Sequence, residues 1–182
     1  MAIIQNNITR NDDDNLFAGI EITPQNQKIS SAEELLDICK ITAFPVDLSL
    51  ILQHLKLSVE EKSLTNELSG SLDVVNQIIY LEKSHSQPRK NFTIAHELGH
   101  YCLHQEVSDK FEDKIFFRSS VTDKHELQAN NFAGELLMPK EEFLKQIKLG
   151  TKTIPKLAEY FDVSTLAVRV RAKQLNLTGH GL

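Results

Sequence analysis

The chain has 182 residues, the length of one domain with room for a small additional part. Its composition, 41% hydrophobic and 25% charged, is close to the average of globular proteins and excludes a chain that is disordered throughout. No apolar run approaches the about 18 residues that a membrane helix needs, and residues 1–7 lack the basic and apolar regions of a secretory signal. The two cysteines, Cys39 and Cys102, cannot form a disulfide framework, and the net charge of −5 disfavours nucleic-acid binding by the whole protein. We therefore expect a soluble protein of the cytoplasm.

Two capped helices are expected after a polar, partly ordered lead-in over residues 1–30. The isoleucines of this lead-in could supply a short strand. The segment Ser30-Ser31-Ala32-Glu33-Glu34 has serine three residues before glutamate, the spacing of a capping box, and so predicts the start of a helix. Asp47 is expected to cap a second helix, because apolar residues recur after it at helical spacing.

The next part of the chain predicts a small sheet and then more helices. Three segments have the pattern of short strands: residues 57–59, 71–75 and 78–81. Asn76-Gln77 is expected as a hairpin turn, and Gly70 as a bend before the sheet. Helices are expected over residues 88–104, 123–137, 140–148, 154–161 and 165–175, with a charged loop over about 105–122. This order of elements predicts the α+β class, with a small antiparallel sheet and surrounding helices.

His96-Glu97-Leu98-Gly99-His100 matches the motif H-E-x-x-H. An α-helix turns about 100° per residue, so His96 and His100 lie roughly 40° apart and both can reach one metal ion. Glu97 lies roughly 100° from His96, close enough to hold a water molecule beside that ion. The other side of the helix is apolar and carries Phe92, Ala95, Leu98, Cys102 and Leu103. This segregation favours a metal site over two surface histidines that stand four apart by accident.

A catalytic zinc site typically has three protein ligands, and the motif supplies two of them. His104 is the nearest candidate in the sequence, but on an unbroken helix it lies about 12 Å along the axis from His96. That is too far to share one tetrahedral ion. Glu126 lies in a separate predicted helix, which the preceding loop could fold across the first. Because Asp123 and Glu126 also have the spacing of a capping box, spacing alone leaves Glu126 equally open as a ligand and as a cap.

Two longer segments extend beyond the motif. The first is Arg89-Lys90-Asn91-Phe92-Thr93-Ile94-Ala95-His96-Glu97-Leu98-Gly99-His100. The second combines Glu126, Ala129-Asn130, Phe132-Ala133 and Glu135-Leu136-Leu137-Met138-Pro139. The pair resembles the ImmA/IrrE family of metallo-endopeptidases, from about Ser31 to the C-terminus and most strongly over residues 89–139. This combination is far more specific than H-E-x-x-H alone.

The resemblance implies a zincin-like peptidase with Zn²⁺ held by His96, His100 and Glu126, and with Glu97 as general base. It raises Asn130, one turn after Glu126, as a residue that orients a histidine ligand, the alternative being a solvated helix asparagine. The family typically cleaves a helix-turn-helix repressor encoded nearby, which implies a protein substrate and relief of repression in a phage, mobile-element or stress circuit. The conceivable second donors to the oxyanion are Tyr101, His104, Arg118 and His125, with core packing the expected role of Tyr101.

Residues 140–182 are expected to form a short helical part after a peptidase domain over residues 31–139. Residues 154–168 resemble a helix-turn-helix, with Asp162 at the turn position where glycine is usual. This C-terminal part carries eight Lys/Arg and four Asp/Glu, a local charge of +4, which leaves −9 for residues 1–139. We expect these helices to pack on the peptidase or contact its substrate, without strong independent binding of nucleic acid. The alternative function is a non-enzymatic DNA-binding or antitoxin-like regulator whose metal site is structural or sensory.

Overall fold

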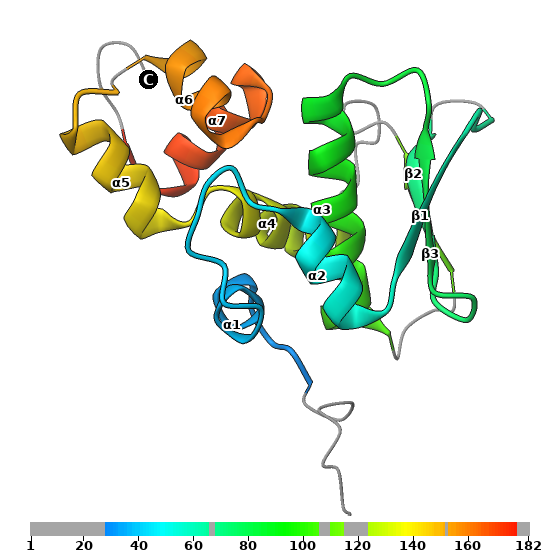
Figure 1. Ribbon diagram of the computed structural model, residues 1–182. Coiled ribbons are helices and arrows are strands. Elements are labelled where there is room, and N and C mark those ends of the chain that lie inside the picture. The colour runs from blue at the N-terminus through cyan, green and yellow to red at the C-terminus, as the bar shows by residue number, and fades with distance from the viewer. Residues whose placement is uncertain (1–27, 66–67, 106–109, 115–123, 152, 178–182) are drawn as a thin grey trace, which may run out of the picture.

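The computed structural model describes residues 28–65, 68–105, 110–114, 124–151 and 153–177, with the backbone alone for 110–114. Its helices are α1 (Ala32–Ile38), α2 (Leu48–Leu55), α3 (Gln87–His104), α4 (Lys124–Leu137), α5 (Lys140–Lys148), α6 (Ile154–Phe161) and α7 (Thr165–Gln174). Its strands are β1 (Ser58–Lys62), β2 (Leu68–Asp73), β3 (Ile78–Glu82) and β4 (Lys110–Lys114). These elements confirm the predicted α+β class (Figure 1). The strand considered within the lead-in falls in residues 1–27, outside the described part of the chain.

Both predicted helix starts near the N-terminus are confirmed. The Ser31 Oγ atom accepts a hydrogen bond from the backbone N–H of Glu34 at 3.1 Å, and the Glu34 carboxylate accepts one from the backbone N–H of Ser30 at 2.8 Å. Asp47 Oδ1 accepts a hydrogen bond from the backbone N–H of Ser49 at 3.0 Å. Side-chain caps of this kind satisfy N–H groups that have no partner inside the first turn of a helix.

The sheet has the strand order β1-β3-β2-β4. β2 and β3 form the predicted antiparallel hairpin, and its turn ends at Gln77 with a φ of 57°. β1 pairs with β3 in parallel, from Ser58↔Ile78 to Lys62↔Glu82, so the prediction of a wholly antiparallel sheet is wrong for this pair. The reason is that β3 lies between β1 and β2. Since β1 and β3 both run opposite to β2, they share a direction and their ladder is parallel.

β4 lies where the sequence predicted only a charged loop. Its backbone pairs antiparallel with the edge of β2, from Leu68↔Lys114 to Asp73↔Lys110. The segment Lys-Phe-Glu-Asp-Lys has no apolar alternation that would predict a strand. An open strand edge offers unpaired N–H and C=O groups, and this ladder, more than the intrinsic preference of the five residues, determines the strand.

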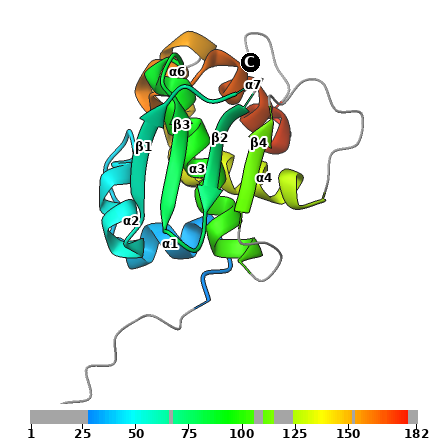
Figure 2. The ribbon, with the colours of Figure 1, turned by 90° about the vertical axis from the view of Figure 1, so that its right-hand side faces the viewer.

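Helix α3 packs across one face of the sheet, and the other described helices lie on the same side (Figure 2). Ile79 and Leu81 of β3 are buried, while the residues between them are half-buried, as expected for a strand with one face on the core. Gly70 lies within β2 and does not form the predicted bend. A Cβ atom there would lie 2.4 Å from Thr93 Cγ2, so glycine permits the close approach of α3 to the sheet.

The three C-terminal helices share one hydrophobic core with the rest of the described chain. Phe161 of α6 stacks on Phe143 of α5, with ring centroids 5.8 Å apart and planes 9° apart. Asp162 has a left-handed backbone with a φ of 49°, and its carboxylate accepts a hydrogen bond from Asn91 Nδ2 at 2.8 Å. Asp162 thus occupies the glycine position of the helix-turn-helix and ties that turn to α3. The division between residues 31–139 and 140–182 stays a prediction.

Among the described residues, no helix has the combination of length and apolar character that crossing a membrane requires.

Candidate metal centre

Helix α3 carries the H-E-x-x-H motif into the interior of the protein. The helix begins with Pro88 in its first turn, where the fixed φ of proline favours a helix start. Every residue from Thr93 to His100 is buried. The Nε2 atoms of His96 and His100 face each other at 3.0 Å, as the helical spacing predicts. Both imidazoles therefore direct one nitrogen to the same point.

Glu126 comes to this point from α4. Its Oε2 lies 3.4 Å from His96 Nε2, and its Oε1 lies 3.3 Å from His100 Nε2. A tetrahedral zinc ion with bonds of about 2.0–2.1 Å keeps its ligand atoms about 3.3–3.4 Å apart. The separations in this cluster fit that geometry. Of the side chains that the structure describes, no other group of three His, Cys, Asp or Glu brings its ligand atoms together in this way.

Burial and charge set the protonation of the cluster. Burial lowers the pKa of His100, although the Glu126 carboxylate opposes that shift. Burial works against ionisation of Glu126, but hydrogen bonds from His100 and His96 outweigh it and hold the Glu126 pKa well below its usual range. A neutral imidazole and an ionised carboxylate are the forms in which these groups bind a metal ion. The Glu126 side chain is 36% exposed, so the cluster is open to solvent on its side.

The second nitrogen of each histidine also has a partner. Asn130 places its Oδ1 2.9 Å from His96 Nδ1, a contact that the predicted role of Asn130 requires, and the role itself stays a prediction. The Nδ1 of His100 lies 3.1 Å from the Nδ1 of His104, one turn further along α3. Each ring is therefore held at Nδ1 while its Nε2 faces Glu126.

The side chain of Glu97 extends from α3 toward strand β2 of the sheet. It is completely buried, on the part of α3 that β2 approaches at Gly70. A Cβ atom added to Gly70 would lie 3.4 Å from Glu97 Oε1. The buried carboxylate therefore lies close to β2 at Gly70, and Glu97 directly follows His96 in the sequence.

Gly99, inside the motif, allows α4 to approach α3. A Cβ atom at Gly99 would lie 2.9 Å from Ala129 Cα, 3.1 Å from Ala129 O and 3.2 Å from Phe132 Cβ. Two of these atoms belong to the backbone of α4 and cannot turn away. Ala129 lies between Glu126 and Asn130 in sequence, so the close approach brings the residues that face the histidines into reach.

We predict that Gly99→Ala pushes α4 away from α3 and lowers the free energy of unfolding by about 1–3 kcal/mol, the usual cost of overpacking. Gly134→Ala is the matched control on α4. A Cβ there has its nearest neighbour at an ordinary 3.4 Å, and alanine gains about 1 kcal/mol of helix propensity over glycine. Denaturant unfolding of both variants measures the difference. Equal stability of the two would contradict the close approach at Gly99.

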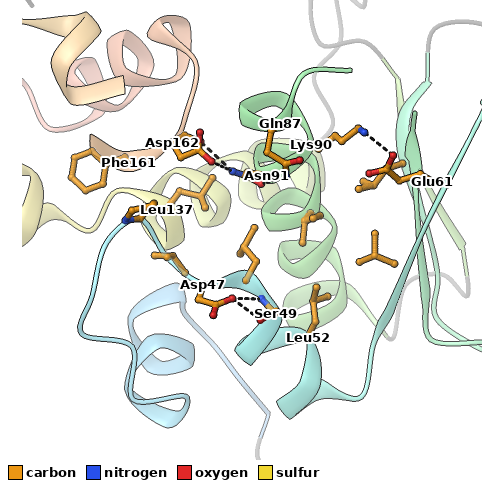
Figure 3. A pocket seen from close by; sticks show the side chains of 16 residues that line it. Asp47, Ser49, Leu52, Glu61, Gln87, Lys90, Asn91, Leu137, Phe161 and Asp162 are labelled. Carbon is orange, nitrogen blue, oxygen red and sulfur yellow. Dashed lines mark hydrogen bonds and ion pairs between the residues drawn. The ribbon is translucent and has the colours of Figure 1, made fainter. Parts of the chain in front are cut away.

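A cleft of about 360 Å³ lies on the other face of α3 (Figure 3). Its lining residues from α3 are Gln87, Lys90, Asn91 and Ile94, so no residue of the motif contributes to it. Polar groups on its rim are paired with one another, for example Lys90 Nζ with Glu61 Oε2 at 2.7 Å. The cleft is therefore separate from the metal centre.

Comparison with known families gives a match to the model of Peptidase_M78, described as the IrrE N-terminal-like domain, over residues 52–173. The chain belongs to this peptidase family. The match confirms the resemblance to ImmA/IrrE proteins.

A phage protein is also similar to this Peptidase_M78 chain. It is named "Uncharacterized immunity region protein 2", comes from Bacillus phage phi105 and is 32% identical over 101 residues. The similar region covers 54% of this chain and 60% of the phage protein, so the chain spans less than two thirds of that relative. The name of the relative associates that protein with a phage immunity region.

The other candidates from the sequence lie in different surroundings within this Peptidase_M78 fold. Tyr101 is half-buried against the hydrophobic core, which confirms its predicted packing role. Cys102 is part of the core, and burial raises the pKa of its thiol to about 12, so it does not contribute to the cluster. The ring of His125 packs against that of His104, with centroids 4.7 Å apart. Arg118 lies outside the described residues.

Proposed function

We propose that the protein is a zinc-dependent endopeptidase in which His96, His100 and Glu126 hold the metal and Glu97 is the catalytic base. The observation that carries this proposal is the convergence of two imidazole nitrogens and one carboxylate within 3.0–3.4 Å, next to a buried glutamate. Two histidines and one carboxylate are a ligand set of catalytic zinc sites, which keep an open position for water. Membership of a peptidase family supports the same reaction class.

Each residue of the site has a separate role in the proposed hydrolysis of a peptide bond. His96, His100 and Glu126 would hold the zinc ion, which would supply a Lewis acid for the scissile carbonyl and would lower the pKa of a water molecule toward about 7. Glu97 takes the proton of the attacking water and passes it to the departing amine. Asn130 holds the ring of His96 in the orientation that directs its Nε2 inward. The exposed side of Glu126 gives a peptide access to the site.

The proposed substrate is a helix-turn-helix repressor, whose cleavage relieves repression in a phage, mobile-element or stress circuit. Two observations support a regulatory substrate: the family resemblance, and a relative named for a phage immunity region. The surroundings of the C-terminal helices favour a role in packing or substrate contact over DNA binding. Arg171 of α7 is buried and donates from Nε to the backbone oxygen of Met138 at 3.0 Å, so it is turned away from any ligand in solution. Asp162 adds a negative charge at the turn itself.

The direct test is incubation of the zinc-loaded protein with the helix-turn-helix repressor encoded beside its gene. We expect two defined fragments of the repressor, no cleavage after treatment with a chelator, and recovery of cleavage when Zn²⁺ is returned. Gel electrophoresis and mass spectrometry identify the fragments and the bond that is cut. A repressor that stays intact with the zinc-loaded protein, together with a mobility shift of promoter DNA by the protein alone, would favour the regulator function.

A further inference from the structure

His104 stands beside the proposed metal ligands in an arrangement that the ligand set does not explain. It is the last residue of α3 and is 3% exposed. Its Nδ1 lies 3.1 Å from His100 Nδ1, and its Nε2 lies 3.2 Å from Gln128 Oε1 on α4. The side chains of Gln128, His104 and His100, from two helices, thus form a hydrogen-bonded chain that ends at His100.

His104 is on the wrong side of His100 to be a ligand itself. The Nε2 of His100 faces His96 and Glu126, whereas its Nδ1 faces His104. The imidazole ring of His100 therefore separates His104 from the point where the three ligand atoms converge.

The direction of the hydrogen bonds follows from the chemistry of imidazole. A neutral imidazole carries one N–H, and a nitrogen that binds a metal must present its lone pair. With Nε2 toward the metal, His100 carries its proton on Nδ1 and donates it to Nδ1 of His104. His104 then carries its own proton on Nε2 and donates it to Gln128 Oε1. Every donor in this line meets an acceptor, and the reverse direction would place a proton on the nitrogen that faces the metal.

We propose that His104 is a positioning residue that fixes the tautomer and ring orientation of His100, with Gln128 fixing His104 in turn. This inference rests on the proposed function, because it assigns a role toward the same metal. The two histidine ligands are then oriented by different partners. Asn130 contacts His96, whereas His104, itself in contact with Gln128, contacts His100. Asn130, Gln128 and Glu126 all come from α4, so this helix both completes the cluster and orients its histidines.

The test measures zinc affinity of metal-depleted protein by competition with a chromophoric chelator. His104→Leu removes the acceptor and is expected to weaken Zn²⁺ binding about 10–100-fold, the range found for lost partners of ligand histidines. His104→Asn keeps an acceptor oxygen close to the position of Nδ1 and is expected to retain most of the affinity. His54→Leu, at an exposed histidine of α2, is the matched control and should bind as tightly as the wild type.

A second measurement is independent of how the variants fold. ¹⁵N–¹H NMR of the imidazoles in the zinc-loaded wild type should find His100 protonated at Nδ1 and His104 protonated at Nε2. A proton on Nδ1 of His104 would overturn the inference. The inference would also be overturned if His104→Leu and His104→Asn lost the same amount of zinc affinity and the same amount of stability in their metal-free forms. That result is what a role in packing alone predicts. Wild-type protein that takes up no Zn²⁺ would instead refute the proposed function, whereas a His104→Leu variant that binds like the wild type refutes this inference alone.

Discussion

Glu97→Gln is expected to leave the metal in place and to remove proteolysis. The amide has nearly the shape of the carboxylate, so it fits the buried position close to β2 at Gly70. It cannot accept a proton, and general base catalysis contributes about 10²–10⁴-fold to a rate. We therefore expect the rate of repressor cleavage to fall by at least about 10²-fold. Metal content by atomic absorption should equal that of the wild type.

Glu135→Gln makes the same change of charge at an exposed position on α4 and should cleave the repressor at the wild-type rate. This control separates the loss of a base from the loss of one negative charge. Continued cleavage by pure Glu97→Gln protein would remove Glu97 from the mechanism. Loss of metal together with activity would instead assign Glu97 a part in holding the ion.

Local patterns predicted the part of the site that a single helix determines. The positions of His96 and His100 on one face follow from 3.6 residues per turn, and the structure places their Nε2 atoms 3.0 Å apart. The caps at Ser31 and Asp47 were equally predictable, because a cap is a contact between residues that are two or three positions apart.

Helical periodicity and capping patterns do not predict contacts between elements that are distant in the sequence. Spacing alone left Glu126 open between a ligand and a helix cap, and only the family resemblance favoured the ligand. The parallel ladder of β1 and β3 depends on the position of β3 between β1 and β2 in the sheet. The strand over 110–114 depends on pairing with the edge of β2. Neither leaves a periodic signal in the residues themselves.

Gly99, inside the motif, and His104, after it, show what the sequence patterns leave out at the site. Gly99 has no side chain to give a pattern, yet a Cβ there would lie 2.9 Å from Ala129 Cα. His104 is too far along α3 from His96 to share its metal ion, and the sequence patterns give it no role toward His100, although the two stand four residues apart; the contact of His104 with Gln128 on α4 is one that helical spacing cannot predict. Sequence reasoning found the histidine pair and, through the family resemblance, Asn130 beside His96, but it missed the contact of His104 with His100.

Glu126→Ala is expected to lose zinc more severely than any variant that removes only a partner of a ligand. It deletes one of three groups that converge on the site, and the oxygens that lie 3.3 and 3.4 Å from the two Nε2 atoms disappear with it. Loss of a residue that merely orients a ligand costs about 10–100-fold in affinity, so we expect a fall of more than about 10²-fold for Glu126→Ala. Competition with a chromophoric chelator, the method proposed for the His104 variants, measures the zinc affinities of the Glu126 and His104 variants on one scale.

The surroundings of Glu126 make this variant a clean measurement. The side chain is 36% exposed and lies in the first turn of α4, so its removal leaves little buried volume empty and the fold should persist. Glu135→Ala removes a carboxylate from the same helix at a distance from the cluster and should bind Zn²⁺ as tightly as the wild type. A Glu126→Ala protein that keeps its zinc while His104→Ala loses it would reverse the assignment of ligand and positioning residue. Because both variants are read by the same titration, the order of their affinities decides which side chain binds the metal and which one holds a ligand in place.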